Sequence, residues 1–354
     1  MDEDDRRNPS PPPGLEEFAS ETTIGDTTFS KSWLFQILMD TIKEGPQPRR
    51  DEDGDAEMVN LSEDIEERLC ILWDISANQE VSAFLLEFDT PTLFVGLISP
   101  TKSPRLVEIL VGILGNMCTF EEICEPVSKT DCLVRVCLWL LGSTDVPTLL
   151  QLCRLLQTCL AHRSASAIWI DSIRDNLAPT VDHLQHILCN SMNGDLLSST
   201  LRLVHRIVDT HSSVKLATAN LEFVRALTSA AMQFLSRNDV LRSYWHILYT
   251  LECETQFAPL LDLCVDDFVC LLKAFLASLP DDSTRAERYQ LLCLPYSFLA
   301  SLTDKGRHLL LDDSAVSECT FQLLHEMREP LPEDDSLRDT LEGALSALTR
   351  GVAR

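Results

Sequence analysis

The hydrophobic positions of this chain recur at the spacing of α-helices from about residue 60 to its C-terminal end. In the first such stretch Ile65, Leu69 and Leu72 follow one another at intervals of four and three residues, which places them on one face of a helix. The sequence contains no stretch of strict alternation and no strand–helix–strand pattern, so it predicts helix after helix. A separate helix is predicted over residues 29–44, with Ser30 or Ser32 as its N-cap.

A start signal for helices returns along the chain at a regular distance. A short helix is predicted over residues 90–99, and Ser103-Pro104 then begins a longer one over 104–118, because serine favours the N-cap and proline the first helical position. The same order returns as a helix over 133–141, a turn, and a helix that begins at Pro147, which is 43 residues after Pro104. Further long helices are predicted over residues 195–209, 239–253 and 285–302.

Such a period is typical of armadillo and HEAT repeats, which are about 40–47 residues long. Each unit carries apolar side chains on both sides, and stacking of neighbouring units buries them in a continuous core. The sequence therefore predicts an all-α, armadillo/HEAT-like α-solenoid of about five to six helical repeats over residues 60–350. A globular helical bundle with regular helix spacing is the alternative.

The segments before the repeats differ in composition. Residues 1–23 are acidic and proline-rich and are predicted to be disordered, since they contain too few apolar side chains to offset the entropy of ordering. Residues 24–44 carry the N-terminal helix, and residues 45–59 form an acidic linker with Gly and Pro.

The distribution of charge excludes one class of partner. The chain of 354 residues has a net charge of −26, yet residues 129–250 carry 11 basic and 9 acidic side chains and are nearly neutral. Acidic ends would repel phosphates, which argues against nucleic acid as a partner. No apolar stretch is long enough to cross a bilayer, and the polar N-terminus does not have the features of a secretory signal. We therefore expect an intracellular protein without a membrane partner.

The thirteen cysteines are an odd number without any C-x-x-C pair, which suits a reducing compartment better than a disulfide framework. Most of them fall among Leu and Ile in helical patterns, where a thiol is a small buried hydrophobe: Cys70, Cys137, Cys153, Cys189, Cys270 and Cys293.

Few residues suggest chemistry. His183, His186 and Cys189 follow one another every three residues, but the i, i+4 spacing and the fourth ligand expected of a metal site are both missing. The acidic run that begins at Asp51 has Ala56 where a calcium loop needs glycine. No phosphate-binding, nucleophile-elbow or zinc-protease motif occurs. We therefore expect no catalytic activity, no cofactor and no metal.

Two features indicate where a partner could bind. Seven arginines concentrate in the central repeats: Arg154, Arg163, Arg202, Arg206, Arg225, Arg237 and Arg242. They form either a mildly basic surface that accepts an acidic peptide or the chain's own acidic tail, or solvated helix faces that pair locally with aspartates. From this set we select Arg154, Arg202 and Arg206 as candidate partner-binding residues.

The second feature is Asn116, which lies near the end of the most apolar helix. An amide both donates and accepts hydrogen bonds, so it could hold the backbone of an extended peptide; a helix-capping asparagine is the alternative. Asn116 is therefore the fourth candidate partner-binding residue.

Several segments together resemble a known family. They are residues 24–35 (IGDTTFSKSWLF), 72–76 (LWDIS), 84–91 (FLLEFDTP) and the Gly112-Ile-Leu-Gly-Asn-Met117 run. This set is similar to the serum-amyloid-A-like, or synoviocyte-proliferation-associated, family; the similarity is good from about residue 24 to 170 and diffuse afterwards. The resemblance implies an armadillo-like fold, no known catalytic activity, and a nuclear role in promoting cell proliferation.

These observations predict a non-catalytic scaffold or adaptor that binds a protein or peptide through its helical-repeat surface. From the resemblance we expect it in the nucleus, with the cytoplasm as a further location. The alternative function is a nuclear transport-receptor-like adaptor that binds a basic peptide.

Overall fold

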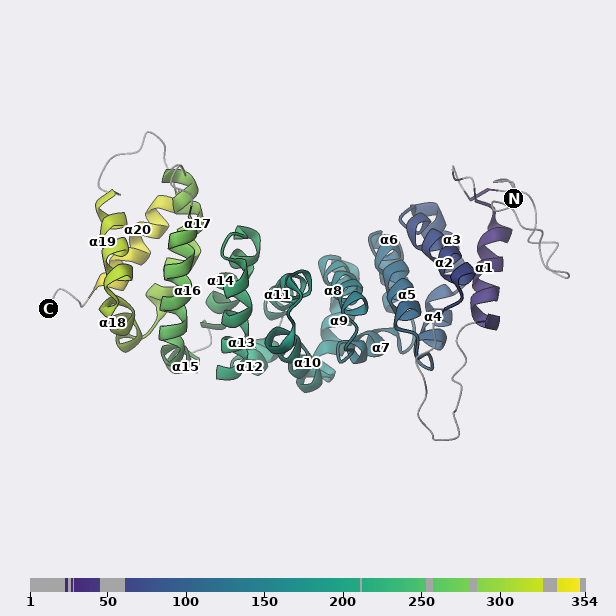
Figure 1. Ribbon diagram of the computed structural model, residues 1–354, viewed down its shortest axis with the longest axis horizontal. Helices are drawn as coiled ribbons and strands as arrows, with labels where there is room; N and C mark the ends of the chain where they lie inside the picture. Colours follow the sequence, from purple (N-terminus) through teal and green to yellow (C-terminus); the bar gives the residue numbers. More distant parts are fainter. Residues whose placement is uncertain are drawn as a thin grey trace. The chain divides into compact units, whose positions relative to one another are not determined.

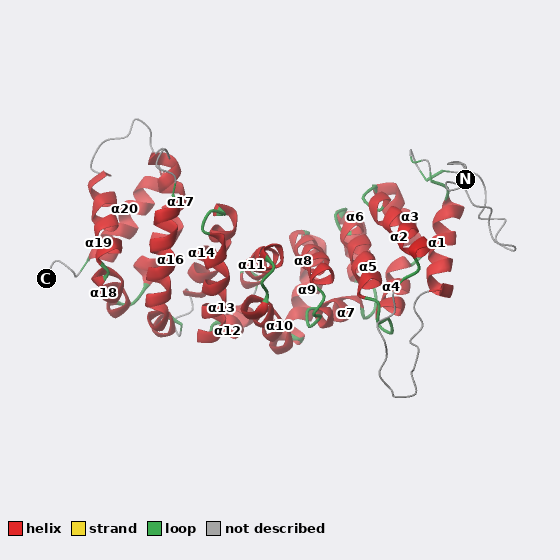
Figure 2. Ribbon diagram, in the orientation of Figure 1, coloured by secondary structure: helices red, strands yellow, loops and turns green. Residues whose placement is uncertain are grey.

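The computed structural model describes residues 23–24, 27, 29–44, 61–210, 212–252, 257–279, 285–326 and 336–350. Within these ranges every regular element is a helix (Figures 1 and 2), apart from an isolated β-bridge between Thr23 and Ser30. The chain divides into two compact units, residues 1–176 and 177–354, called here the first and the second unit. The segments predicted as disordered (1–23) and as linker (45–59) lie outside the described residues, except Thr23.

The first unit consists of short helices in a repeating order. They are α1 (Lys31–Glu44), α2 (Glu63–Ile75), α3 (Gln79–Glu87), α4 (Thr90–Ile98), α5 (Pro104–Met117), α6 (Glu121–Ser128), α7 (Leu133–Leu140), α8 (Val146–Ala161) and α9 (Arg163–Asp175). Helices three apart along the chain pack together: α2, α5 and α8 form one row, α3, α6 and α9 a second, and α4 packs on α7 (Figure 1). This arrangement defines a three-helix repeat, whose last and longest member we call the third helix.

The second unit follows the same rule. Its helices are α10 (Leu177–Asn190), α11 (Gly194–Val208), α12 (Ser212–Thr218), α13 (Leu221–Ala231), α14 (Asn238–Glu252), α15 (Ala258–Leu261), α16 (Val265–Ser278), α17 (Arg285–Ser301), α18 (Asp304–Asp312), α19 (Ser314–Glu326) and α20 (Ser336–Thr349). The third helices α11, α14, α17 and α20 pack in one row, and α10, α13, α16 and α19 pack in another. The all-α solenoid predicted from the sequence is confirmed.

The predicted long helices coincide with third helices because their start signals are made as expected. The Ser103 hydroxyl accepts from the Leu106 N–H at 3.4 Å, and the Asp145 carboxylate accepts from the Thr148 N–H at 2.9 Å. The sequence analysis gave no helix for the first helices α3 and α6, which have only nine and eight residues, nor for the longer α9 and α16.

The third helix α5 is the core of the first unit. Eleven of its residues are buried, among them Leu110, Ile113 and Leu114, which are fully inaccessible to solvent. Full burial of one such side chain contributes about 1.5–3 kcal/mol. Because α2 covers one flank of α5 and α8 covers the other, the buried side chains of α5 contribute this stability only when both neighbouring helices are packed against it.

Two glycines let the neighbours approach α5 closely. A Cβ atom added at Gly112 would lie 2.2 Å from Cε2 of Trp73 on α2. One added at Gly115 would lie 3.0 Å from Nη2 of Arg154 on α8. The small-residue surface of α5 therefore receives an indole from one side and a guanidinium from the other.

Within the described residues, no single helix is long and apolar enough to span a membrane. Among the described helices, α3 and α4, which are bent by 75° relative to each other, are the one pair that passes the length and composition criterion together.

We predict that Gly112→Ala destabilises the first unit by about 1–3 kcal/mol, because the methyl group displaces the Trp73 indole from its packed position. The measurement is the midpoint of urea unfolding. Gly96→Ala is the matched control, since no atom lies within 4 Å of its added Cβ. That helical substitution should be neutral or stabilise by up to about 1 kcal/mol. Equal midpoints for the two variants would contradict the prediction.

Candidate partner-binding site

The four candidate residues from the sequence lie on third helices in a common register. The N-caps of α5, α8 and α11 are Ser103, Asp145 and Asn193. Arg154 and Arg202 each follow their N-cap by nine residues, and Asn116 and Arg206 each follow theirs by thirteen. Positions four apart lie on the same helical face. We call this side of the third helices the third-helix face and describe it separately for each unit.

In the first unit, Asn116 joins three consecutive third helices. Its Nδ2 donates to the Trp73 carbonyl at 2.8 Å and to the Ser76 hydroxyl at 3.0 Å, both at the end of α2. Its Oδ1 accepts from Nη1 of Arg154 on α8 at 2.9 Å. Both amide N–H groups are therefore used inside the fold, and the side chain does not cap its own helix. The predicted contact of Asn116 with a peptide stays a prediction. The side-chain group left for such a contact is the second lone pair of Oδ1, which could accept one more hydrogen bond.

Arg154 is held by two groups of α5. Besides the bond to Asn116, its Nη2 donates to the Gly112 carbonyl at 2.9 Å. Burial lowers the pKa of this guanidinium, which nevertheless stays charged at neutral pH. Within the described parts of the chain, no carboxylate lies within ion-pair distance of Arg154. The structure thus fixes an uncompensated cation on the third-helix face of the first unit.

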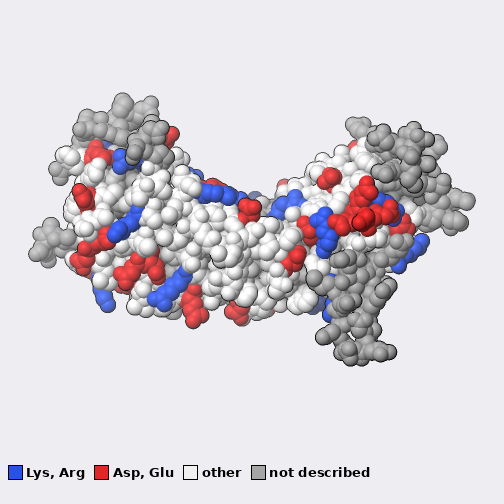
Figure 3. All heavy atoms as spheres, viewed as in Figure 1, with Lys and Arg blue, Asp and Glu red and all other residues white. Residues whose placement is uncertain are grey.

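Two other arginines of the first unit pair with carboxylates of neighbouring helices. Arg105 on α5 bonds Glu66 on α2 at 2.7 Å and Glu108 at 2.7 Å. Arg68 bonds Asp40 of α1 at 2.8 Å. Figure 3 shows acidic and basic side chains mixed over α2 and α5. The two arginines of α2 and α5 are therefore neutralised locally, and the remaining carboxylates of α2 leave this part of the surface with an excess of negative charge.

In the second unit the arginines divide into two groups. Arg202 forms an ion pair with Asp239 of α14, which also receives Arg237 at 3.3 Å. Arg206 on α11 and Arg242 on α14 are exposed, and among the described residues neither has a carboxylate partner. Local pairing therefore accounts for Arg202, whereas Arg206 and Arg242 remain available cations.

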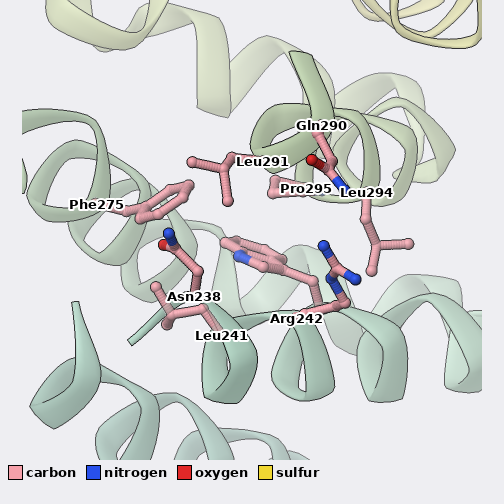
Figure 4. A pocket seen from close by; sticks show the side chains of 9 residues that line it. Asn238, Leu241, Arg242, Phe275, Gln290, Leu291, Leu294 and Pro295 are labelled. Carbon is pink, nitrogen blue, oxygen red and sulfur yellow. The ribbon is translucent and has the colours of Figure 1, made fainter. Parts of the chain in front are cut away.

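A cavity of about 80 Å³ opens beside Arg242, between α14, α16 and α17 (Figure 4). Its lining residues are Asn238, Leu241, Arg242, Trp245, Phe275, Gln290, Leu291, Leu294 and Pro295. Trp245 is 1% exposed, and its indole N–H has no hydrogen-bond acceptor among the described residues. Pro295 lies inside α17 and has no N–H, so the Leu291 carbonyl lacks its helical donor. Two residues that line the cavity therefore each have a hydrogen-bonding group that lacks its usual partner: the indole N–H of Trp245 and the backbone carbonyl of Leu291.

The cysteines of the described segments are buried, half-buried or exposed, and Cys70, predicted to be buried, is half-buried. Cys137, Cys153 and Cys293 are buried as predicted, and burial raises the pKa of Cys137 to about 12. The prediction was wrong for Cys189 and Cys270, which are exposed because they lie on the outward sides of α10 and α16. A further buried group, Cys118, Cys124 and Cys159, brings three sulfur atoms within 4.8 Å of one another.

The histidine stripe of α10 does not gather around one point. His186 is exposed and contacts Asn190 of its own helix at 3.1 Å. The structure instead brings together His205, Asp209 and His246 from α11 and α14. The sequence carries one sign of this cluster, the i, i+4 spacing of His205 and Asp209. His246 lies 37 positions after Asp209, so the sequence does not show that it joins them.

The fold and this face define an all-α helical-repeat protein. An engineered protein from a structural genomics consortium (target OR497) has a TM-score of 0.60 at 15% identity, covering 89% of this chain and 68% of that one. A designed armadillo repeat protein has a TM-score of 0.40 at 13% identity, over 88% and 98% of the two chains.

Similarity in sequence defines the family. The model of the SAAL1 C-terminal domain matches residues 180–288. Protein saal1 of Danio rerio is 38% identical over 69% of this chain and 55% of its own length. Protein SAAL1 of Homo sapiens is 38% identical over 57% of this chain and 44% of its own length. The chain belongs to the serum amyloid A-like 1 (SAAL1) family.

The chain spans about half the length of the curated relatives it matches. The match at residues 180–288 corrects the expectation that the resemblance becomes diffuse after residue 170.

We predict that Asn116→Ala destabilises the first unit by about 1–3 kcal/mol, because the Trp73 carbonyl and the Arg154 guanidinium lose their buried partner. Chemical unfolding followed by circular dichroism measures the change. Asn190→Ala removes an exposed amide near the end of α10 and should stay within about 0.5 kcal/mol of the parent. A loss for Asn116→Ala no larger than for the control would show that the bridge contributes nothing.

We also predict that, of the cysteines in described segments, Cys189 and Cys270 react first with iodoacetamide in the native protein. Cys137 should react only after unfolding, since its burial excludes reagent and keeps its thiol protonated. Peptide mass spectrometry after a short labelling pulse measures this order. Rapid native labelling of Cys137 would contradict the packing of α7.

Proposed function

We propose that this SAAL1-family protein is a non-catalytic adaptor that binds an acidic segment of a protein partner on the third-helix face of its second unit. The observation that carries the proposal is the pair Arg206 and Arg242, two exposed arginines without carboxylate partners on packed third helices. A nearby arginine, Arg202, is already neutralised by Asp239. The two available guanidiniums can each bind a carboxylate through two parallel hydrogen bonds.

The cavity beside Arg242 lets this surface select a partner by an apolar side chain as well as by charge. Its Leu and Phe side chains suit an apolar side chain of the partner, while the Trp245 N–H can donate to a carbonyl that arrives with it. An unsatisfied buried donor costs about 1–3 kcal/mol, and that cost is recovered when a ligand accepts the bond. The preferred ligand is therefore an acidic segment that also contains one apolar anchor.

The acidity of the whole chain does not oppose this binding mode. The net charge is −26, but residues 129–250, which include Arg206 and Arg242, are nearly neutral. Exposed charges are largely screened beyond about 8 Å at physiological ionic strength. Charges on the face itself then dominate the contact with a ligand.

A location in the nucleus and a role in promoting cell proliferation belong to the same proposal. Their support is the resemblance of residues 24–170 to the family, together with the 36–39% identity to the curated relatives. Arg154 with Asn116 supports a second contact point in the first unit, where the fixed cation could receive a further carboxylate of the partner.

The test is fluorescence polarisation with a labelled peptide that combines glutamates with one leucine. We expect charge reversal in Arg206→Glu/Arg242→Glu to weaken binding by at least tenfold, since each lost charged contact is worth about 1.5–3 kcal/mol. A lysine-rich peptide of equal length tests the transport-adaptor alternative in the same assay.

Arg225→Glu is the matched control. This exposed arginine lies on α13 and pairs with Asp267 at 3.6 Å, so its reversal changes the net charge without touching the proposed surface. Equal loss of binding in the control and in the double variant would show that net charge alone causes the loss, and would contradict the proposed surface. Tighter binding of the lysine-rich peptide would replace the proposal with its alternative.

A further inference from the structure

His205, Asp209 and His246 form a cluster at the contact of two third helices. His205 and Asp209 lie one turn apart on α11, which presents them on the same side. His246 comes from α14, which packs beside α11 (Figure 1). Neither helix alone carries more than two of the three groups.

The side-chain atoms of the cluster converge on one carboxylate. Nε2 of His246 lies 3.0 Å from each Asp209 oxygen, and Nε2 of His205 lies 3.7 Å from Asp209 Oδ2. The two imidazole rings are 4.2 Å apart between centroids. One ligand atom from each residue lies within 4.8 Å of the other two.

The spacing of these ligand atoms also fits an ion-binding site. Zn²⁺ binds histidine nitrogen and carboxylate oxygen at about 2.0–2.2 Å, so tetrahedral ligand atoms lie roughly 3.4 Å apart. Two imidazoles and one carboxylate are also a frequent donor set for divalent first-row metals. We propose that His205, Asp209 and His246 bind a divalent transition-metal ion, with Zn²⁺ as the expected occupant.

The surroundings of the carboxylate support this assignment. Thr250 on α14 donates its hydroxyl to Asp209 Oδ1 at 3.3 Å, and such second hydrogen bonds orient metal ligands. A lone histidine–aspartate pair would need only one imidazole, whereas here a second ring is directed at the same oxygen. Arg206 and Arg242 are the neighbouring cations on the two helices, and they oppose binding of the ion by repulsion.

The site is open toward solvent. The side chains of His205, His246 and Asp209 are 31%, 35% and 45% exposed. Three protein ligands leave one tetrahedral position for water or for a group of a partner. The ion would join α11 to α14 at their exposed edge.

The test is isothermal titration of the metal-free 354-residue chain with Zn²⁺. We expect His246→Gln and Asp209→Asn to bind the ion at this site at least about 10- to 100-fold more weakly than the parent. His186→Gln is the matched control, because it removes an exposed histidine of α10. Its titration should equal that of the parent. Zn²⁺ binding by cysteines elsewhere would be the same in the parent and in all three variants. It therefore cannot produce a difference in affinity between them.

Thermal unfolding provides the second readout. Zn²⁺ should raise the unfolding temperature of the parent and of His186→Gln more than that of His246→Gln, whose own melting without metal reports whether it is folded. Identical Zn²⁺ titrations of the parent and of His246→Gln would overturn the proposal. Absence of Zn²⁺ binding by the parent would overturn it as well.

Discussion

The inner third helices of each unit, α5 in the first and α14 and α17 in the second, pack against the third helix before them and the third helix after them. The helix α5 buries eleven of its fourteen residues, so apolar side chains surround most of its circumference and one neighbouring helix could not cover them. Its stability therefore depends on α2 and α8. The short first helices and the loops follow from this constraint, because they only need to return the chain to the start of the next third helix.

The same constraint explains where polar groups lie. At α5, two glycines have no side chain, so Trp73 and Arg154 approach the helix backbone closely. Asn116 then donates a hydrogen bond to the Trp73 carbonyl and accepts one from Arg154. At α11 and α14, the corresponding contact is made by Arg202 with Asp239 and by two histidines with Asp209. Polar side chains on the third-helix face thus hold consecutive helices together, and the exposed cations without a carboxylate partner are the most available to a ligand. This distinction separates Arg206 and Arg242 from their neighbours.

The sequence was sufficient for elements whose signals are local. Long apolar helices with capped starts, such as α5 and α8, were predicted to within about two residues of their bounds. The first helices α3 and α6 were missed because they are too short for a clear period, and α6 contains Pro126. The exposure of Cys189 was also missed, since a leucine-rich window does not specify which flank a neighbour covers.

The candidate site was predictable only in part, because its properties arise between helices. The sequence located Asn116 and the arginines on the correct helices. It could not show that Asn116 donates into the fold, that Arg202 finds Asp239 on the next third helix, or that His246 meets Asp209 across 37 residues. Each of these facts depends on a register between helices that lie about 40 residues apart in the sequence.

The bridge between Asn116 and Arg154 tests the dependence of the fold on contacts between third helices most directly. A double-mutant cycle of Asn116→Ala, Arg154→Ala and the double variant, measured by chemical unfolding, isolates the energy of this pair from that of either side chain alone. The structure predicts a coupling of about 0.5–3 kcal/mol, with the double variant less destabilised than the two single losses added together. Additive losses would contradict the claim that polar groups on the third-helix face hold consecutive repeats together.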